Sequence, residues 1–326
     1  MCALPRPPLD PELAAGLALI PDQVTPRTLE TLPAVRQAVT PLEAVVGDRP
    51  IEVTEHTVTS YDGAEIIVTV FRREGHSDAA VPGVYHIHGG GMITGNRFRG
   101  AQWFVPWIEE FDVVAATVEY RLAPENPDPT PVEDCYAGLE WFTRNAAEFG
   151  FDPDRVLVMG GSAGGGLAAG VTLLARDRGG PGIAWQFLSC PMLDDRDQTV
   201  STRQIVDGVP WARDSNRFGW QSLLGERYGT DDVSVYAAPA RATDLSGLPP
   251  TYLDVGDAEV FRDEVVAFAS KLWEAGINCE LHVWAGGFHG FGMIYSAQVS
   301  VQAAQAGNDW ISRQFSRLPR RPGDVA

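Results

Sequence analysis

A serine stands among closely spaced glycines near the middle of the chain, where residues 160–164 read GGSAG. A short apolar run, 156–159, comes before this motif, and an alanine-rich stretch follows it. Glycines let the chain turn sharply from a strand into a helix, because side chains there would collide with neighbouring strands. Such a turn holds the serine hydroxyl clear of the sheet in strained backbone geometry. The pattern predicts Ser162 as a nucleophile, since a phosphate-binding loop would need the lysine of G-x-x-x-x-G-K-[ST], which this motif lacks.

A second glycine-rich motif, His88 followed by three glycines at 89–91, ends the apolar run 84–88. Glycine amides can point toward a ligand because no Cβ blocks its approach. Two such amides would face the oxygen that becomes negative when a serine attacks an ester carbonyl, and each donor stabilises the transition state by about 3 kcal/mol. We therefore expect an oxyanion hole here, with His88 anchoring the loop by hydrogen bonds.

The candidate base is His289, which lies in the glycine-rich segment 286–291, just after an apolar run that ends at Trp284. A histidine accepts and returns a proton near neutral pH, as a serine nucleophile requires. Its late position gives the chain order serine, acid, histidine, which is typical of hydrolases with a strand–turn–helix serine. We assign the remaining histidines to packing, to loop structure or to the surface: His56, His76, His86, His88 and His282.

Three motifs in order resemble the hormone-sensitive-lipase-like esterases, the bacterial family IV: HGGG at 88–91, YRLAPE at 120–125 and GGSAGG at 160–165. The resemblance extends from about residue 80 to residue 292. It implies an α/β-hydrolase fold with a helical cap, and hydrolysis of short-chain carboxylic esters without a metal ion or an organic cofactor. Carried over residue by residue, it implies an oxyanion hole formed by Gly90, Gly91 and Ala163.

Two positions depart from the pattern of this family. The residue before the serine is often aspartate in the family and is Gly161 here, and the residue after HGGG is commonly aromatic and is Met92 here. Both positions border the expected pocket, so they bear on substrate preference more than on the chemistry. Trp211 and Phe218 are further candidates for pocket walls, and packing inside the cap is the alternative role for both.

The acid partner of the base has two candidates. The family usually carries D-P-L-x-D-E, whereas residues 256–264 read GDAEVFRDE. Aligning the final RDE with the end of that motif places Glu259 at the acid position, where a glutamate can hold the imidazole tautomer and stabilise its positive charge. Asp257 competes because it follows the apolar run 251–255 almost directly. We favour Glu259, and expect the other carboxylate to stabilise a turn or a helix end.

These residues predict acyl transfer through a covalent acyl-enzyme, with Ser162 attacking the ester and His289 moving the proton. An amidase or deacetylase could use the same groups, and the sequence does not separate it from an esterase. A non-catalytic receptor built on the same fold is disfavoured because Ser162 and His289 are both present. A lipase acting at oil interfaces is disfavoured by the acidic composition and the lack of an apolar anchor.

The hydrophobic pattern predicts the elements that must position these groups. Alternating runs at 51–58 and 64–71 flank a Tyr-Asp-Gly turn, which is typical of a hairpin. Short, continuously apolar runs then alternate with helical segments. Strands that are apolar on both faces lie between helix layers, so we expect a mostly parallel sheet flanked by helices. The runs are Val84–His88, Val113–Val118, Val156–Met159, Ile183–Leu188, Thr251–Val255 and Leu281–Trp284.

Two helices can be located from their ends. Thr130 and Glu133, in the sequence TPVE, predict a helix start with a capping box. A later helix is predicted to end near Gly276. The apolar stripe of this later helix is Val265, Phe268 and Leu272.

The alternation of strands and helices breaks between Cys190 and about Pro239, where aromatic residues stand among many charges. An insertion of this size in an α/β fold is typical of a cap or lid. We expect residues 191–239 and the proline-rich segment 1–48 to form the cap, and residues 49–190 and 240–326 to form the catalytic domain.

Composition limits the partners. A formal net charge of −18 disfavours nucleic acid and anionic lipid, since both require clustered lysine and arginine. No uninterrupted apolar run reaches the roughly 18 residues that a membrane span needs. A small-molecule ester is therefore the expected partner, and the cytoplasm the expected location. Pairing through the late strand that ends at Trp284 could also form a homodimer. The scattered cysteines predict free thiols in a reducing compartment: Cys2, Cys135, Cys190 and Cys279.

Overall fold

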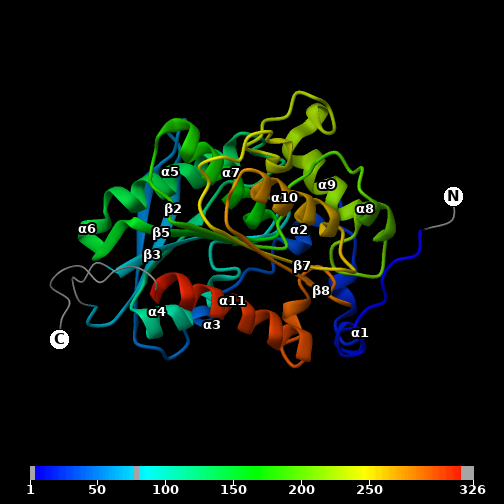
Figure 1. Ribbon diagram of the computed structural model, residues 1–326, viewed down its shortest axis with the longest axis horizontal. Coiled ribbons are helices and arrows are strands. Elements are labelled where there is room, and N and C mark those ends of the chain that lie inside the picture. The colour runs from blue at the N-terminus through cyan, green and yellow to red at the C-terminus, as the bar shows by residue number, and fades with distance from the viewer. Residues whose placement is uncertain (1–3, 77–80, 317–326) are drawn as a thin grey trace.

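The computed structural model describes residues 4–76 and 81–316, which contain one eight-stranded sheet in the order β1-β2-β4-β3-β5-β6-β7-β8 (Figure 1). β2 pairs antiparallel with both β1 and β4, and the other neighbouring strands are parallel. The mostly parallel sheet and the hairpin β1–β2 confirm the fold class expected from the hydrophobic pattern. The strands are β1 (Ile51–Thr59), β2 (Glu65–Arg73), β3 (Val81–Ile87), β4 (Val114–Glu119), β5 (Phe151–Gly161), β6 (Trp185–Ser189), β7 (Thr251–Gly256) and β8 (Cys279–Trp284).

The central strands are buried on both faces. The four residues 156–159 of β5 are all fully buried, and alternate members belong to two different hydrophobic clusters, one on each side of the sheet. Strand side chains point to opposite faces in turn, so a strand between two helix layers must be apolar throughout. This burial explains why the sequence shows continuous apolar runs here, rather than the alternation seen in β1.

Helices cover both faces of the sheet (Figure 1). One layer contains α5 (Thr130–Arg144), α6 (Ala146–Phe149), α7 (Ala163–Arg178) and α10 (Arg262–Glu274). The other contains α4 (Val105–Phe111) and α11 (Gln298–Ser316), whose Trp107 and Trp310 belong to the second cluster. The connections between these elements contain short 3-10 helices: η2 (Ala101–Trp103), η4 (Pro239–Arg241) and η5 (Phe291–Met293).

One helix end differs from its prediction. α5 begins at Thr130, but the Thr130 side chain does not cap it: its Oγ1 lies 3.2 Å from the Tyr61 hydroxyl. The Glu133 carboxylate accepts two hydrogen bonds from Arg178 instead of reaching back to the helix start. The capping box is therefore wrong, because partners from distant elements compete for both side chains. The later helix, α10, does end as predicted: Gly276 follows it with φ of +75°.

The N-terminal segment packs against the insertion that follows β6. Pro5 O accepts a hydrogen bond from Gln204 at 2.5 Å, and the Arg27 amide donates to Ser215 Oγ at 3.0 Å. The N-terminal elements are α1 (Pro11–Leu17), η1 (Pro21–Val24), α2 (Leu32–Val35) and α3 (Glu43–Val46). The insertion contains α8 (Val200–Gln204), α9 (Arg213–Leu224) and η3 (Gly225–Arg227).

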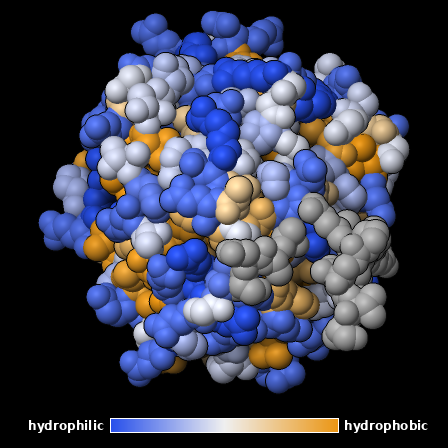
Figure 2. Space-filling view, turned by 90° about the vertical axis from the view of Figure 1, so that its left-hand side faces the viewer, coloured by the Kyte–Doolittle hydropathy of each residue, from blue (hydrophilic) through white to orange (hydrophobic). Residues whose placement is uncertain are grey.

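Both hydrophilic and hydrophobic residues lie at the surface. Figure 2 shows one end of the molecule, where hydrophilic residues predominate and hydrophobic ones form separate small areas. Among the helices of the described ranges, none is both long enough and apolar enough to cross a membrane. Three cysteines are free thiols, Cys135 and Cys279 buried and Cys190 half-buried, whereas Cys2 lies outside the described residues.

Candidate active site

The segments expected to carry the chemistry meet at one edge of the sheet. β3, β5, β7 and β8 are parallel, and their ends are in register: Ile87 pairs with Gly160, and Gly256 pairs with Trp284. Ligands of parallel sheets bind beyond the carboxyl ends of the strands. The glycine loop after β3, the serine after β5 and the loops after β7 and β8 therefore share one location.

Ser162, His289 and Glu259 form a hydrogen-bonded line at this edge. Ser162 Oγ lies 2.9 Å from His289 Nε2, and His289 Nδ1 lies 2.5 Å from Glu259 Oε1. A carboxylate only accepts hydrogen bonds, so Nδ1 donates to Glu259 and Nε2 is left as the acceptor for the serine hydroxyl. This is the tautomer that a general base for serine requires.

The serine sits on a strained turn between β5 and α7. Its φ of +58° and ψ of −127° lie where residues other than glycine are rare. The Ser162 amide donates to Ser189 O at 2.9 Å, which holds the turn against the end of β6. The flanking glycines are needed for space. A Cβ on Gly160 would lie 2.3 Å from Gly164 O, and one on Gly164 would lie 2.1 Å from Ile87 O.

The two candidate acids have different contacts. Glu259 is fully buried, and its second oxygen accepts a hydrogen bond from the Gly256 amide at 3.1 Å. Asp257 accepts from the Gly286 amide at 2.7 Å. It is therefore Glu259 that contacts His289, while Asp257 ties the loop after β7 to the loop after β8.

Buried rings and one thiol surround the base. The His289 ring meets Phe261 edge-on at 5.1 Å and lies 6.3 Å from the Trp211 ring. Cys190 Sγ and the ligand atoms of Glu259 and His289 lie within 4.8 Å of one another. Such a group could in principle hold a metal ion. However, the Glu259 carboxylate and the His289 imidazole are hydrogen-bonded to each other, so these two ligand atoms are engaged. Burial also raises the pKa of the Cys190 thiol well above its ordinary value, which disfavours the thiolate that a metal ion would bind.

The glycine loop after β3 passes close to the serine. A Cβ on Gly89 would lie 2.7 Å from Gly161 O and 3.3 Å from Ser162 Cβ. Gly90 and Gly91 have φ of +129° and +64°, which only glycine adopts readily. A Cβ on Gly91 would also lie 2.2 Å from the Trp211 ring. The loop can approach the nucleophile this closely only because these positions are glycine.

His88 holds the start of this loop. Its ring stacks on Tyr120 at 4.1 Å, and the Tyr120 hydroxyl donates to His88 O at 3.0 Å. His88 Nδ1 donates to Gly89 O at 2.9 Å. Burial lowers the pKa of His88 to about 3, so this imidazole stays neutral and structural near neutral pH.

Arg36, from the N-terminal segment, holds the far end of the same loop. Its guanidinium donates to Ile93 O at 2.8 Å and to Ala123 O at 2.7 Å, and it pairs with both oxygens of Glu125. The hydrogen bond with Arg36 lowers the pKa of Glu125 to about 2. Nothing in the local sequence around Arg36 predicted this contact, because its partners are more than fifty residues away.

The candidate pocket residues differ in burial. Met92 is fully buried, and its carbonyl accepts from the Ala123 amide at 2.9 Å. Trp211 is 7% exposed, and Phe218 is half-buried. Trp103, which the sequence did not single out, is 40% exposed and contacts the glycine before the nucleophile.

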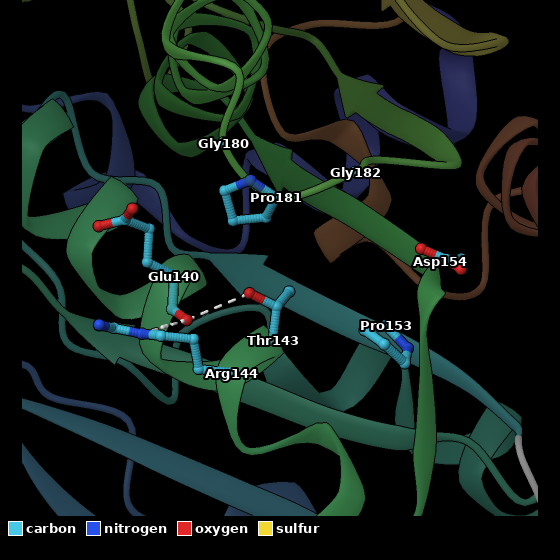
Figure 3. A pocket seen from close by; sticks show the side chains of 8 residues that line it. All are labelled: Glu140, Thr143, Arg144, Pro153, Asp154, Gly180, Pro181 and Gly182. Carbon is cyan, nitrogen blue, oxygen red and sulfur yellow. Dashed lines mark hydrogen bonds between the residues drawn. The ribbon is translucent and has the colours of Figure 1, made fainter.

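A separate hollow of about 350 Å³ lies away from this edge (Figure 3). Pro153 and Asp154 line it near the start of β5, whereas Ser162 follows the end of that strand. The Glu140 carbonyl accepts hydrogen bonds from Thr143 and Arg144 inside it. The hollow is therefore separate from the candidate site around Ser162.

Known proteins share this architecture. A family model described as the α/β hydrolase fold matches residues 84–293. Carboxylesterase NlhH of Mycobacterium tuberculosis is 32% identical, over 92% of this chain and 93% of that protein. Rabbit arylacetamide deacetylase is 29% identical, over 74% of this chain and 75% of its own. The solved structure of a bacterial heroin esterase superposes with a TM-score of 0.86 at 40% identity, over 94% of this chain and 98% of that one.

The family model spans more than half of the chain, and NlhH is matched over nearly its whole length. The residues that the family model matches include the motifs after β3 and β5. The chain therefore belongs to the hormone-sensitive-lipase-like carboxylesterases, family IV, of the α/β-hydrolase fold.

Proposed function

We propose that this chain is a serine carboxylester hydrolase, acting on short-chain acyl esters through Ser162, His289 and Glu259. The observation that carries the proposal is the continuous hydrogen-bonded line from the Ser162 hydroxyl through His289 to the buried Glu259 carboxylate. A serine hydroxyl is a weak nucleophile until an adjacent base takes its proton, and the base needs a third group to orient it. That the three groups lie at one edge of the sheet supports the proposal.

The reaction proceeds in two steps. Ser162 Oγ attacks the ester carbonyl carbon while His289 Nε2 takes the hydroxyl proton. The tetrahedral intermediate collapses, the bond to the alcohol oxygen breaks, and His289 returns the proton to the departing alcohol. Water then attacks the acyl-enzyme with His289 again as base, which releases the carboxylic acid and restores Ser162. The Glu259 carboxylate stabilises the imidazolium that forms.

The amides of Gly90, Gly91 and Ala163 stabilise the oxyanion. Ala163 begins α7, so its amide also lies at the positive end of a helix dipole. Donors fixed by the fold need not reorganise during the reaction, and each is worth about 3 kcal/mol. The contacts of His88 and Arg36 with the loop support this fixed arrangement.

We also propose that residues 1–48 and 191–239 act together as a cap over the site, and that residues 49–190 and 240–326 form the catalytic domain. The contacts between residues 5 and 204 and between residues 27 and 215 support the pairing of the two cap segments. In this arrangement Met92, Trp211 and Phe218 border the substrate pocket. A homodimer through the edge strand β8 and a cytoplasmic location stay predictions.

The experiment is a chain-length series of p-nitrophenyl esters, from acetyl and butyryl to octanoyl and palmitoyl, with the purified protein. We expect fast release of p-nitrophenol from the short esters, reduced by at least about a thousandfold in Ser162→Ala. Ser270→Ala is the matched control, because this half-buried serine on α10 donates a hydrogen bond to Val266 O away from the site. Turnover that survives in Ser162→Ala, or no turnover by the unaltered protein, would refute the proposal.

Amide hydrolysis is the second candidate, favoured by the similarity to arylacetamide deacetylase. The two activities share the nucleophile and differ in how readily the leaving group is protonated. p-Nitroacetanilide in the same assay separates them: turnover of the anilide close to that of p-nitrophenyl acetate would make the chain a deacetylase. We expect the ester to be cleaved much faster.

A further inference from the structure

Two arginines near the candidate site, Arg27 and Arg99, have no acidic partner. Among the residues that the structure describes, neither forms an ion pair, and no carboxylate contributes to the pKa of either guanidinium. Acidic groups are not scarce, since the chain has 43 of them and only 25 lysines and arginines. Arg97, two residues before Arg99, pairs with Glu119. The lack of a partner is therefore particular to this pair of arginines.

Arg99 packs beside the part of the glycine loop that approaches the nucleophile. A Cβ on Gly95 would lie 3.3 Å from Arg99 Cδ and 2.7 Å from Gly89 O. Gly89 in turn approaches the serine, because a Cβ there would lie 3.3 Å from Ser162 Cβ. Burial is the main cause of the low pKa of His88, and the charge of Arg99 adds to it. The guanidinium therefore lies close to the start of the loop that meets Ser162.

Arg27 belongs to the N-terminal segment that packs on the insertion. Its amide donates to Ser215 Oγ at 3.0 Å, and its Nη1 donates only to a neighbouring carbonyl in its own segment. The residue after Ser215 is Asn216, which accepts a hydrogen bond from Trp211 Nε1 at 3.4 Å. The Trp211 ring lies 6.3 Å from the His289 ring. Arg27 is thus attached to the part of the insertion that reaches the base.

The two guanidinium groups repel each other. Burial, followed by the charge of Arg99, lowers the pKa of Arg27, so the two charges are near enough to interact. Burial also lowers the pKa of Arg99, although its side chain is exposed to solvent. Water therefore reaches Arg99 in a place that protein largely surrounds. Two like charges in such a place are stabilised when an anion binds to both.

We propose that Arg99 and Arg27 bind an anionic group of the substrate, so that the preferred esters carry a second, ionised acid group, a carboxylate in the simplest case. A guanidinium presents its N–H donors in a planar fork that matches the two oxygens of a carboxylate. Such a substrate supplies the partner that both arginines lack within the chain. This inference rests on the proposed ester hydrolysis at Ser162.

The test uses two pairs of esters, each a carboxylate and the neutral amide of similar shape. The charge is on the acyl part in mono-p-nitrophenyl adipate, which is compared with p-nitrophenyl adipamate. It is on the alcohol part in 3-acetoxybenzoate, which is compared with 3-acetoxybenzamide. The quantity measured is the ratio of kcat/KM for the charged ester to kcat/KM for the neutral one, because differences in intrinsic reactivity cancel when this ratio is compared between variants.

The variants are Arg99→Gln, Arg99→Lys, Arg27→Gln and Arg144→Gln. Glutamine removes the charge and keeps a hydrogen-bond donor, whereas lysine keeps the charge and loses the planar fork. Arg144 is the matched control, an exposed arginine on α5 that has no acidic partner among the described residues. It lines the hollow in Figure 3, which is separate from the site.

We expect the unaltered enzyme to favour the charged ester of at least one pair. In that pair Arg99→Gln should lower the ratio by about tenfold, the size of one hydrogen bond to a charged group, and Arg27→Gln should lower it too. Arg99→Lys should keep part of the ratio, and Arg144→Gln should leave it unchanged. The pair that responds shows whether the acyl or the alcohol part carries the anion.

Ratios that stay unchanged in Arg99→Gln and Arg27→Gln for both pairs would overturn the inference and leave the esterase proposal intact. A ratio below one for both pairs in the unaltered enzyme would do the same. Hydrolysis of none of the four esters by the unaltered enzyme would contradict both proposals.

Discussion

At the scale of single residues, the assignment of the acid depends on which carboxylate contacts His289. Glu259 Oε1 lies 2.5 Å from His289 Nδ1, while Asp257 binds the amide of Gly286 in the neighbouring loop. Both carboxylates follow β7 within three residues, so chain position alone does not separate them. Their hydrogen bonds distinguish them, because only Glu259 bonds to His289.

The first prediction concerns these two carboxylates. Glu259→Gln should lower kcat by about a thousandfold to ten-thousandfold, because an amide can donate to Nδ1 and stabilise the wrong imidazole tautomer. Asp257→Asn should change kcat by less than about tenfold, since the new side chain still offers an oxygen to the Gly286 amide. Steady-state kinetics with p-nitrophenyl butyrate measure both variants. The reverse order of effects would assign the acid to Asp257.

Much of the site could be predicted from the sequence because glycines mark it. The expected nucleophile, base and acid are brought together by motifs whose glycines are required by close backbone contacts, as at Gly160 and Gly164. Trp103 and Arg36 gave no such signal. A tryptophan beside a strand or an arginine in a proline-rich segment is common, and only the folded chain shows what each contacts.

At the scale of secondary-structure elements, the site depends on how closely β3, β5 and α7 approach one another. Gly164, in the first turn of α7, packs on the end of β3, where a Cβ would lie 2.1 Å from Ile87 O and 2.6 Å from His88 O. The same contact brings the loop after β3 to the nucleophile. Element types were predictable from apolar periodicity. The capping of α5 was not, since Tyr61 contacts the Thr130 hydroxyl and Arg178 binds the Glu133 carboxylate.

The second prediction tests this close approach. Gly164→Ala should lower the free energy of unfolding by about 3 kcal/mol or more, because the methyl group must displace backbone rather than a flexible side chain. Gly182→Ala is the control, since a Cβ there meets nothing within 4 Å. Urea unfolding followed by circular dichroism measures both. A Gly164→Ala variant as stable as Gly182→Ala would show that β3 and α7 are packed less closely than described.

The third prediction concerns the contact of the N-terminal segment with the glycine loop. Arg36→Gln should lower kcat by about tenfold with a smaller change in KM, because a loosened loop holds the oxyanion donors less well in the transition state. Arg49→Gln removes an exposed pair with Glu109 and is the matched control. A larger effect on KM than on kcat would mean that Arg36 acts on substrate binding instead.

At the scale of the whole molecule, most acidic groups lie at the surface, and a few carboxylates are buried. Asp254, in β7, is 8% exposed and accepts a hydrogen bond from Trp284 Nε1 at 3.3 Å. Burial raises its pKa to about 6. Its folded-state pKa therefore lies above the ordinary value near 3.8. Between about pH 4 and pH 6 the folded protein retains a proton on Asp254 that the unfolded chain has lost.

The fourth prediction follows from the upward shift of the Asp254 pKa on folding. Stability from protonated Asp254 is fully present below about pH 4 and is lost as the pH rises through about 6, a difference of about 3 kcal/mol. Asp254→Asn cannot ionise, so it should be more stable than the unaltered protein at pH 7.5 by up to that amount. The measurement is the free energy of unfolding between pH 4 and pH 8. Parallel profiles for the two proteins would show that Asp254 does not titrate in this range.

The measurement that most directly tests the central claim is the site of covalent modification by diethyl p-nitrophenyl phosphate, which phosphorylates activated serines. We predict a single adduct on the peptide that contains Ser162, formed in parallel with the loss of ester hydrolysis and absent from Ser162→Ala. Peptide mass spectrometry locates the adduct. Loss of activity with the adduct on another residue, or ester hydrolysis that continues after Ser162 is fully modified, would contradict the account.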